Sequence, residues 1–130
     1  MIKELVYICS PLGASTQEEI RKNMDKARKY MKIVSEKLDC RALAPHAILP
    51  EYLDESVPEE RQLGLKFGLD LLRICKKIVI CGDVISKGMS EEIRLAERLG
   101  IEILHLKEQT MPKVKITIIE IEGDSDGLHF

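Results

Sequence analysis

The fold of this 130-residue chain is decided by the stretch Ile78-Val79-Ile80-Cys81-Gly82-Asp83-Val84-Ile85-Ser86-Lys87-Gly88-Met89-Ser90-Glu91-Glu92-Ile93. Its first four residues are apolar, which is typical of a strand buried on both faces of a parallel sheet. A loop containing Gly, Asp and Ser follows, and a helical pattern begins directly after it. In open α/β sheets, ligands bind beyond the carboxyl ends of the strands, where such a loop can direct backbone N–H groups at an anion. The stretch therefore predicts a candidate active site, with the Glu92 carboxylate in the first turn of the helix.

Length and composition limit the class of protein. A chain of 130 residues, 45% hydrophobic and 32% charged, suits one globular domain. The net charge of -2 provides no basic surface for duplex nucleic acid. No apolar run approaches the length of a membrane span, and a strand pattern begins close to the first residue. We therefore expect a cytoplasmic protein with neither a membrane anchor nor a signal peptide.

The cysteines do not have the spacing of a metal site. They lack the short paired spacing that zinc ligands require, and three of them lie within apolar runs. We expect all four to be buried free thiols: Cys9, Cys40, Cys75 and Cys81. No complete glycine-rich dinucleotide motif is present either, so the sequence predicts neither a metal nor a cofactor.

Strand and helix patterns alternate along most of the chain. Expected strands cover residues 5–9, 41–44, 77–81 and 101–106. The first expected helix runs from Ser15 or Thr16, which are alternative caps, to Leu38. The second begins at Pro58 and contains a leucine-rich segment that should be well buried. The third runs from Ser90 to Leu99 and ends before the C-cap Gly100. This order predicts a doubly wound, flavodoxin- or Rossmann-like α/β fold with a mostly parallel sheet of four to five strands.

The last part of the chain has a different pattern. Val114, Ile116 and Ile118 alternate with polar residues, which is typical of a half-exposed strand. The connection from the preceding strand is too short for a parallel crossover, which needs a dozen or more residues. We expect an antiparallel edge strand, or one that pairs with a second subunit. Residues 1–110 then form the main domain, and residues 111–130 form its last strand and a tail that frays from Gly123.

Parallel topology brings three loops to one edge of the sheet: residues 10–14, 45–46 and 82–92. Each candidate residue there also has an ordinary structural explanation. Ser10, Gly13 and Ser86 are turn or capping residues by type, and His46 can be held by backbone groups. Outside these three loops, Tyr7 suits the core. Asp70 lies in an apolar helix and is either paired in the site or exposed.

These segments resemble the nucleoside 2-deoxyribosyltransferase superfamily. That superfamily includes the 2'-deoxynucleoside 5'-monophosphate N-glycosidases and many small uncharacterised phage and bacterial proteins. The resemblance covers about the first 106 residues. The motifs that carry it are Tyr7-Ile8-Cys9-Ser10-Pro11-Leu12-Gly13, Pro45-His46, Asp70-Leu71-Leu72 and Ser86-Lys87-Gly88-Met89-Ser90-Glu91-Glu92-Ile93-Arg94-Leu95-Ala96.

The resemblance implies a catalytic set. Glu92 matches the nucleophile that attacks the anomeric carbon of a deoxyribosyl group as the base leaves. Asp70 matches a helical Asp that orients the sugar or handles a proton, and Tyr7 matches a strand-end Tyr beside the nucleophile. The implied activity is cleavage or transfer at the N-glycosidic bond of a (deoxy)nucleoside or nucleotide.

The resemblance also implies a substrate-binding set: Ser10, Gly13, His46, Ser86, Gly88 and Met89. Ser10 and Ser86 match serines that bind the 5'-phosphate in the monophosphate glycosidases, whereas Leu12 stands where those enzymes carry a phosphate-binding Arg. The alternative function is a non-catalytic module that binds a nucleotide or an ADP-ribose-like ligand. We expect a homodimer or a larger homo-oligomer, because active sites in this superfamily are often completed by a neighbouring subunit.

Overall fold

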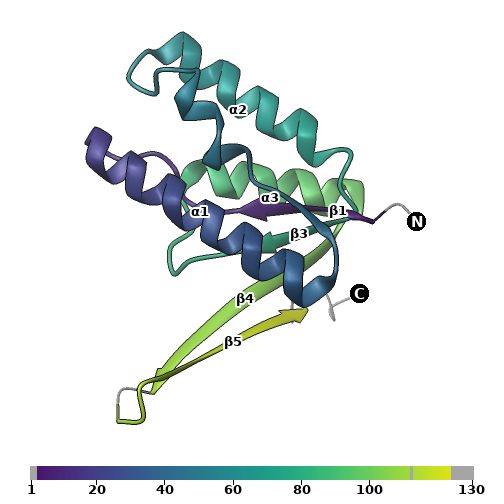
Figure 1. Cartoon of the computed structure of the whole chain (residues 1–130). Helices are drawn as coiled ribbons and strands as arrows, with labels where there is room; N and C mark the ends of the chain where they lie inside the picture. The colour runs from purple at the N-terminus through teal and green to yellow at the C-terminus, as the bar shows by residue number, and fades with distance from the viewer. Residues whose placement is uncertain (1–2, 112, 124–130) are drawn as a thin grey trace.

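The computed structural model describes residues 3–111 and 113–123. Its sheet has the strand order β2-β1-β3-β4-β5, and β1, β3, β4 and β5 are labelled in Figure 1. Strands β1 to β4 are parallel, and β5 is antiparallel to β4. The strands are β1 (Leu5–Cys9), β2 (Arg41–Leu43), β3 (Lys77–Ile80), β4 (Glu102–Met111) and β5 (Ile116–Gly123). The predicted doubly wound, mostly parallel α/β fold is confirmed.

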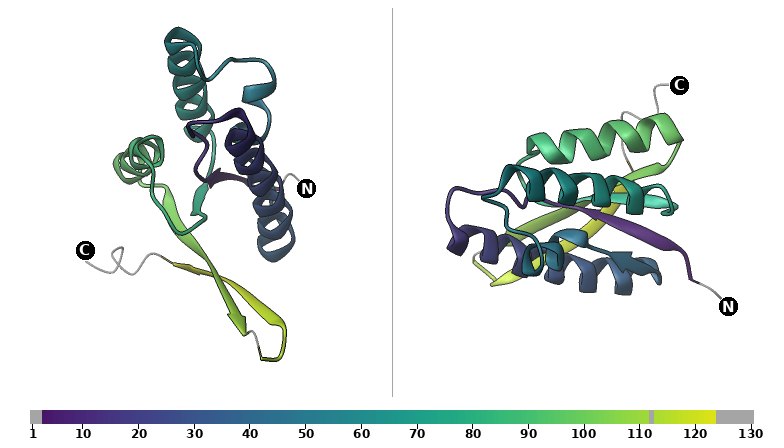
Figure 2. Two further views of the ribbon diagram at one scale, coloured as in Figure 1. Left: turned by 90° about the vertical axis from the view of Figure 1, so that its left-hand side faces the viewer. Right: turned by 90° about the horizontal axis from the view of Figure 1, so that it is seen from above.

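Helices cover both faces of this sheet (Figure 2). They are α1 (Gln17–Leu38), α2 (Pro58–Leu72) and α3 (Lys87–Leu99), with short 3-10 turns η1 (Pro45–Ala47) and η2 (Leu49–Glu51). Side chains of β1 alternate between the faces. Val6 and Ile8 pack in a cluster with α1, whereas Tyr7 and Cys9 pack in a second cluster with α2 and α3. The alternation therefore places Tyr7 and Cys9 on the face covered by α2 and α3.

The strand order defines where a ligand crevice can form. The chain moves from β1 to β2 on one side, and then crosses to β3 on the other side of β1. Ligands of doubly wound sheets bind at such a switch point, beyond the carboxyl ends of the two central strands. The loops after β1 and β3 are therefore the ones that border the crevice.

Capping side chains set the starts of α1 and α3. Of the two caps predicted for α1, Thr16 is the one used, and its Oγ1 accepts a hydrogen bond from the Glu19 N–H at 3.1 Å. Ser86 caps α3 in the same way, with its Oγ 3.2 Å from the Met89 nitrogen. Helix α3 thus begins at Lys87, and the prediction of a start at Ser90 was wrong.

The earlier start of α3 changes the position of Glu92 in the helix. Glu92 lies in the second turn, and the first turn contains no acidic residue. The influence of the helix dipole falls off within the first turn. The prediction that Glu92 lies in the first turn, within reach of the dipole, was therefore wrong.

Helix α2 is less buried than its leucines suggest. Of its residues only Gly68 and Leu72 are buried, while Leu63 is 54% and Phe67 is 48% exposed. Its Leu63, Phe67 and Leu71 side chains border an open groove of about 590 Å³ shared with η1 and η2. The prediction of a well-buried helix was wrong because an apolar helical run does not specify how many of its sides are covered.

Strand β4 extends further than the expected end at Leu106. It pairs with β3 only as far as His105, and then continues to Met111 beside β5. The two strands form a ribbon that projects from the sheet (Figure 1). The antiparallel edge strand is confirmed, with Val114 in the turn rather than in the strand.

The remaining boundaries differ little from the prediction. The other strand ends agree to within one residue, which is the usual uncertainty of such limits. Strand β4 crosses the proposed domain limit at residue 110, and that division stays a prediction. Gly123 closes β5, and the rest of the expected frayed tail lies outside the described residues. Within residues 3–111 and 113–123, no helix combines the length and apolarity needed to cross a bilayer.

Gly100 provides a test of the backbone at the end of α3. It is the predicted C-cap and has a φ of 70° in the left-handed region. A Cβ placed there would meet nothing within 4 Å, so substitution changes only the backbone preference. We expect Gly100→Ala to lower the free energy of unfolding by about 1 kcal/mol, measured by urea titration. Gly100→Asn should lose less, because Asn tolerates this conformation; equal losses for both variants would contradict the interpretation.

Candidate active site

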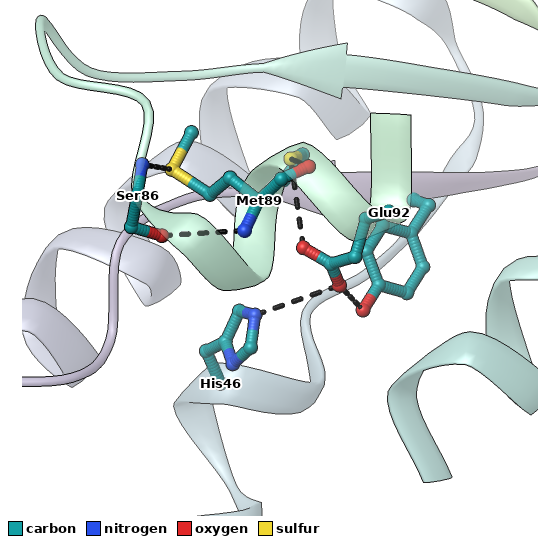
Figure 3. A network of polar contacts seen from close by, with 6 residues as sticks. His46, Ser86, Met89 and Glu92 are labelled. Atoms are coloured by element: carbon teal, nitrogen blue, oxygen red, sulfur yellow. Dashed lines mark hydrogen bonds and ion pairs between the residues drawn. The ribbon is translucent and has the colours of Figure 1, made fainter. Parts of the chain in front are cut away.

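Glu92 is a buried carboxylate beside the crevice and is 5% exposed. Its Oε2 accepts a hydrogen bond from the Tyr7 hydroxyl and lies 3.6 Å from Nε2 of His46 (Figure 3). The Cys9 thiol donates to its Oε1 with an Sγ–Oε1 distance of 3.5 Å. A buried charge is costly unless it is paired or hydrogen-bonded. These contacts, made by β1 and η1 to α3, partner both oxygens of the carboxylate.

The two β1 donors remain protonated. Burial raises the pKa of the Tyr7 hydroxyl well above its usual value, and the neighbouring Glu92 raises it further. Burial and Glu92 likewise raise the pKa of the Cys9 thiol well above its usual value. Both groups therefore act as hydrogen-bond donors to Glu92 rather than as competing anions.

Gly68 allows α2 to approach this cluster. A Cβ at Gly68 would lie 3.0 Å from the Tyr7 hydroxyl oxygen and 3.7 Å from Oε2 of Glu92. Gly64 stands one turn earlier on the same side of the helix. Each glycine in a helix interior costs about 1 kcal/mol relative to Ala. Two glycines four residues apart are therefore a sequence signal of close approach, and the predictions made from the sequence did not include it.

Two adjoining cavities flank this cluster. A void of about 10 Å³ borders Glu92 and has room for no more than one water molecule. A larger cavity of about 120 Å³ lies next to it. Both are bordered by His46, Gly64, Leu65 and Gly88. His46 thus stands between the carboxylate and the larger cavity.

The larger cavity, which we call the anion cavity, is bordered by Ser10, Arg61, Ser86 and Lys87. Ser10 is 1% exposed, and its Oγ has no hydrogen-bond partner among the residues that the structure describes. The cavity also lies at the N-terminus of α3, where free N–H groups and the helix dipole favour an anion. Two cationic side chains, a buried unpaired hydroxyl and a helix N-terminus together suit an anionic group.

Arg61 was not among the residues predicted from the sequence. Its guanidinium nitrogens lie 3.1 and 3.2 Å from where a Cβ on Gly13 would be, so Gly13 leaves room for the cation. Leu12, at the position expected to carry a cation, is instead buried against Ile20 and Met24. The sequence signal that could have pointed to Arg61 was its position in the first turn of α2. The helix dipole disfavours positive charge there, so a cation at that position suggests a functional role.

Glu55 also borders the anion cavity. Burial raises the pKa of its carboxyl group, while Arg61 and His46 act in the opposite direction. Glu55 therefore offsets part of the positive charge of the cavity wall.

The structure does not bring every predicted residue together. Asp70 is exposed and lies two residues beyond Gly68, which turns its side chain about 200° around the helix axis from the Glu92 cluster. Met89 is buried, with its sulfur 3.4 Å from the Ser86 nitrogen (Figure 3). Ser10, Gly13, His46, Ser86, Gly88 and Met89 all border the anion cavity. Their roles in binding, and that of Asp70 in catalysis, stay predictions.

The first part of the loop after β3 lies elsewhere. Gly82, Asp83 and Val84 border a second, polar cavity of about 380 Å³ on the α1 side, which Ser10 borders as well. All four cysteines are buried and unpaired, as predicted. Across the described ranges, no three His, Cys, Asp or Glu side chains gather in an arrangement that could hold a metal ion.

Comparison with known proteins places this fold. The solved structure of a 2-deoxyribosyltransferase from Bacillus psychrosaccharolyticus is similar, with a TM-score of 0.56 and 17% sequence identity over 76% of this chain and 69% of that one. The likeness shows that this chain shares the fold of that enzyme. The chain itself belongs to the family described as a domain of unknown function (DUF7768), whose model matches residues 4–106. No curated protein matches the sequence.

The two glycines of α2 form a matched test of the cluster. Gly64→Ala would place its Cβ 3.4 Å from a flexible leucine methyl, whereas Gly68→Ala would place it 3.0 Å from the Tyr7 hydroxyl oxygen. Both substitutions gain the same helix propensity. We expect Gly68→Ala to be less stable than Gly64→Ala by at least about 1 kcal/mol in urea unfolding. Equal stabilities would show that α2 does not need this close approach.

Proposed function

We propose that this protein cleaves or transfers at the N-glycosidic bond of a (deoxy)nucleoside or nucleotide, with Glu92 as the nucleophile. The observation that carries the proposal is a buried, fully partnered carboxylate that borders a small void next to a cavity suited to an anion. The resemblance of the motifs around Tyr7 and Glu92 to 2-deoxyribosyltransferases supports it, as does the shared fold.

The proposed chemistry uses the charge of Glu92. The anomeric carbon becomes cationic as the base leaves, and a nearby carboxylate traps that charge as a glycosyl ester. The C1'–N bond breaks with its electron pair going to the base, and a bond from C1' to Oε2 of Glu92 forms. Water or the N–H of a second base then attacks C1', the C1'–Oε2 bond breaks to restore the carboxylate, and the proton of the attacking group passes to the departed base directly or through solvent. Tyr7 orients Oε2 throughout by its hydrogen bond.

Removal of the Glu92 charge is the direct test. Glu92→Gln should lower release of free base by a factor on the order of 10³ or more, measured chromatographically on a panel of deoxynucleosides and their 5'-monophosphates. Glu97→Gln, an exposed position on the same helix, is the matched control and should keep full activity. Base release that survives in Glu92→Gln at the rate of the unaltered protein would refute the proposal.

The anion cavity supports a substrate with a 5'-phosphate. Ser10, Ser86 and Arg61 border the anion cavity, and this cavity shares lining residues with the void at Glu92. A sugar that reaches Glu92 can therefore extend its charged end into the anion cavity. In this proposal Arg61 binds the phosphate, as a phosphate-binding Arg after β1 does in the monophosphate glycosidases. On this proposal, a nucleoside without phosphate leaves the Ser10 hydroxyl unpaired and binds more weakly.

Arg61 separates the two substrate classes. We expect Arg61→Gln to raise KM for a deoxynucleoside 5'-monophosphate by roughly 10-fold to 100-fold, with kcat little changed, because one charge-assisted hydrogen bond is lost. KM for the free deoxynucleoside should stay the same. Arg73→Gln, at the exposed end of α2, provides the control. A parallel loss for both substrates would mean that Arg61 supports the fold rather than the phosphate.

A specific observation also favours the second candidate, a module that binds a nucleotide or an ADP-ribose-like ligand without cutting it. The void at Glu92 is about 10 Å³, too small for a sugar unless α2 or η1 moves. Calorimetry with the same nucleotide panel distinguishes the two functions, since tight binding without base release over hours supports the second. A homo-oligomer and a cytoplasmic location also stay predictions; the exposed Leu63 and Phe67 on α2 support the former.

A further inference from the structure

The two oxygens of Glu92 have unlike donors. Oε2 faces the Tyr7 hydroxyl and the His46 imidazole, while Oε1 faces the Cys9 thiol. The Cys9 sulfur lies 3.5 Å from Oε1 and 3.9 Å from the Met89 carbonyl oxygen, and the side chain is fully buried. The charged, nearer acceptor is Oε1, so the thiol proton is directed at Glu92.

A thiol differs from the usual partners of a buried carboxylate. An S–H group is a weak donor, whereas hydroxyl and N–H groups donate strongly. Strong donors stabilise the charged form of a carboxylate and make it less basic. A weak donor at Oε1 therefore fills the space and directs the carboxylate while it withdraws little charge.

We propose that Cys9 is a positioning residue that orients Glu92 through a weak S–H···Oε1 hydrogen bond and thereby preserves its reactivity as a nucleophile. The part that concerns reactivity rests on the function proposed above. In the glycosyl ester, Oε2 carries the new bond to C1' and Oε1 becomes the carbonyl oxygen. Cys9 keeps its proton and its contact with Oε1 throughout, so it neither gains nor loses a bond.

Few other groups can influence this carboxylate. Tyr7 from β1 and His46 from η1 face Oε2, and the exposed Glu91 borders the same small void. Helix α2 contributes only glycines and leucines to that void, none of which carries a charge. A change at Cys9 alone can therefore be read in the pH dependence of Glu92.

Cys81 provides a matched control. It is a fully buried thiol directly after β3, next to Cys9 in the sheet, since its N–H donates to the Cys9 carbonyl oxygen. It packs with the α1 cluster on the opposite face, and its sulfur contacts the Val79 carbonyl. Cys81→Ser therefore measures the cost of a buried hydroxyl without reaching Glu92.

The experiment compares Cys9→Ser, Cys9→Ala and Cys81→Ser by carbon NMR of ¹³C-carboxyl-labelled glutamate, titrated with acid. A serine hydroxyl donates more strongly, so Cys9→Ser should move the acid midpoint of the Glu92 signal down by about 0.5 to 1 pH unit. Cys9→Ala removes the donor and should move the midpoint up by a similar amount. Cys81→Ser should leave it unchanged.

Kinetics on a cleaved substrate extend the test. Cys9→Ser should lower kcat several-fold with KM unchanged, and should shift the acidic limb of the pH–rate profile in the same direction as the NMR midpoint. Shifts of equal sign in both Cys9 variants, or no shift in either, would overturn the proposal. If Cys9→Ser does not fold, Cys9→Ala alone tests the proposal. An upward shift of the Glu92 midpoint supports the proposal, and no shift or a downward shift overturns it. If the two Cys9 variants shift the Glu92 midpoint in opposite directions but the unaltered protein releases no base, the function proposed above is refuted. The orienting role of Cys9 would then still stand.

Discussion

The burial of one negative charge is the constraint on which the rest of the site depends. Glu92 lies among apolar residues of β1, α2 and α3, where an unpartnered carboxylate would destabilise the fold. The Tyr7 hydroxyl and the Cys9 thiol both reach it because alternate residues of a strand face the same side. Gly68 then lets α2 close over the pair. The catalytic candidate is thus also a structural element, which ties the position of the carboxylate to the packing of three secondary structures.

The anion cavity depends on positive charge rather than on the burial of a negative one. Its positive character comes from the N-terminus of α3 and from side chains of separate elements, Arg61 on α2 and Lys87 on α3. The Ser10 hydroxyl is buried without a partner among the described residues, and such a group normally has one. A ligand with a charged end and an electrophilic carbon would satisfy both parts of the site, because His46 and Gly88 border the cavity and the void at Glu92 alike.

Much of the architecture could be predicted locally. Short apolar runs predicted the strands, and Thr16 and Gly100 predicted helix ends, because these effects act over a few residues. Errors arose where packing decides. The leucines of α2 do not indicate that one side of the helix stays exposed, and Ser86 and Gly88 made the first turn of α3 resemble part of the loop. Strand β4 extends beyond its apolar segment because β5 pairs with its polar end.

Local sequence patterns were enough to predict the α/β class, the order of strands and helices, and the loops that meet at the carboxyl edge of the sheet. Apolar periodicity and turn residues act through neighbours in the chain, so they can be read directly. The contacts of Glu92 with Tyr7, Cys9 and His46, the exposure of Asp70, and the approach of Arg61 to Gly13 depend on tertiary packing. Those contacts join residues far apart in the chain, and their geometry depends on how closely the helices pack on the sheet.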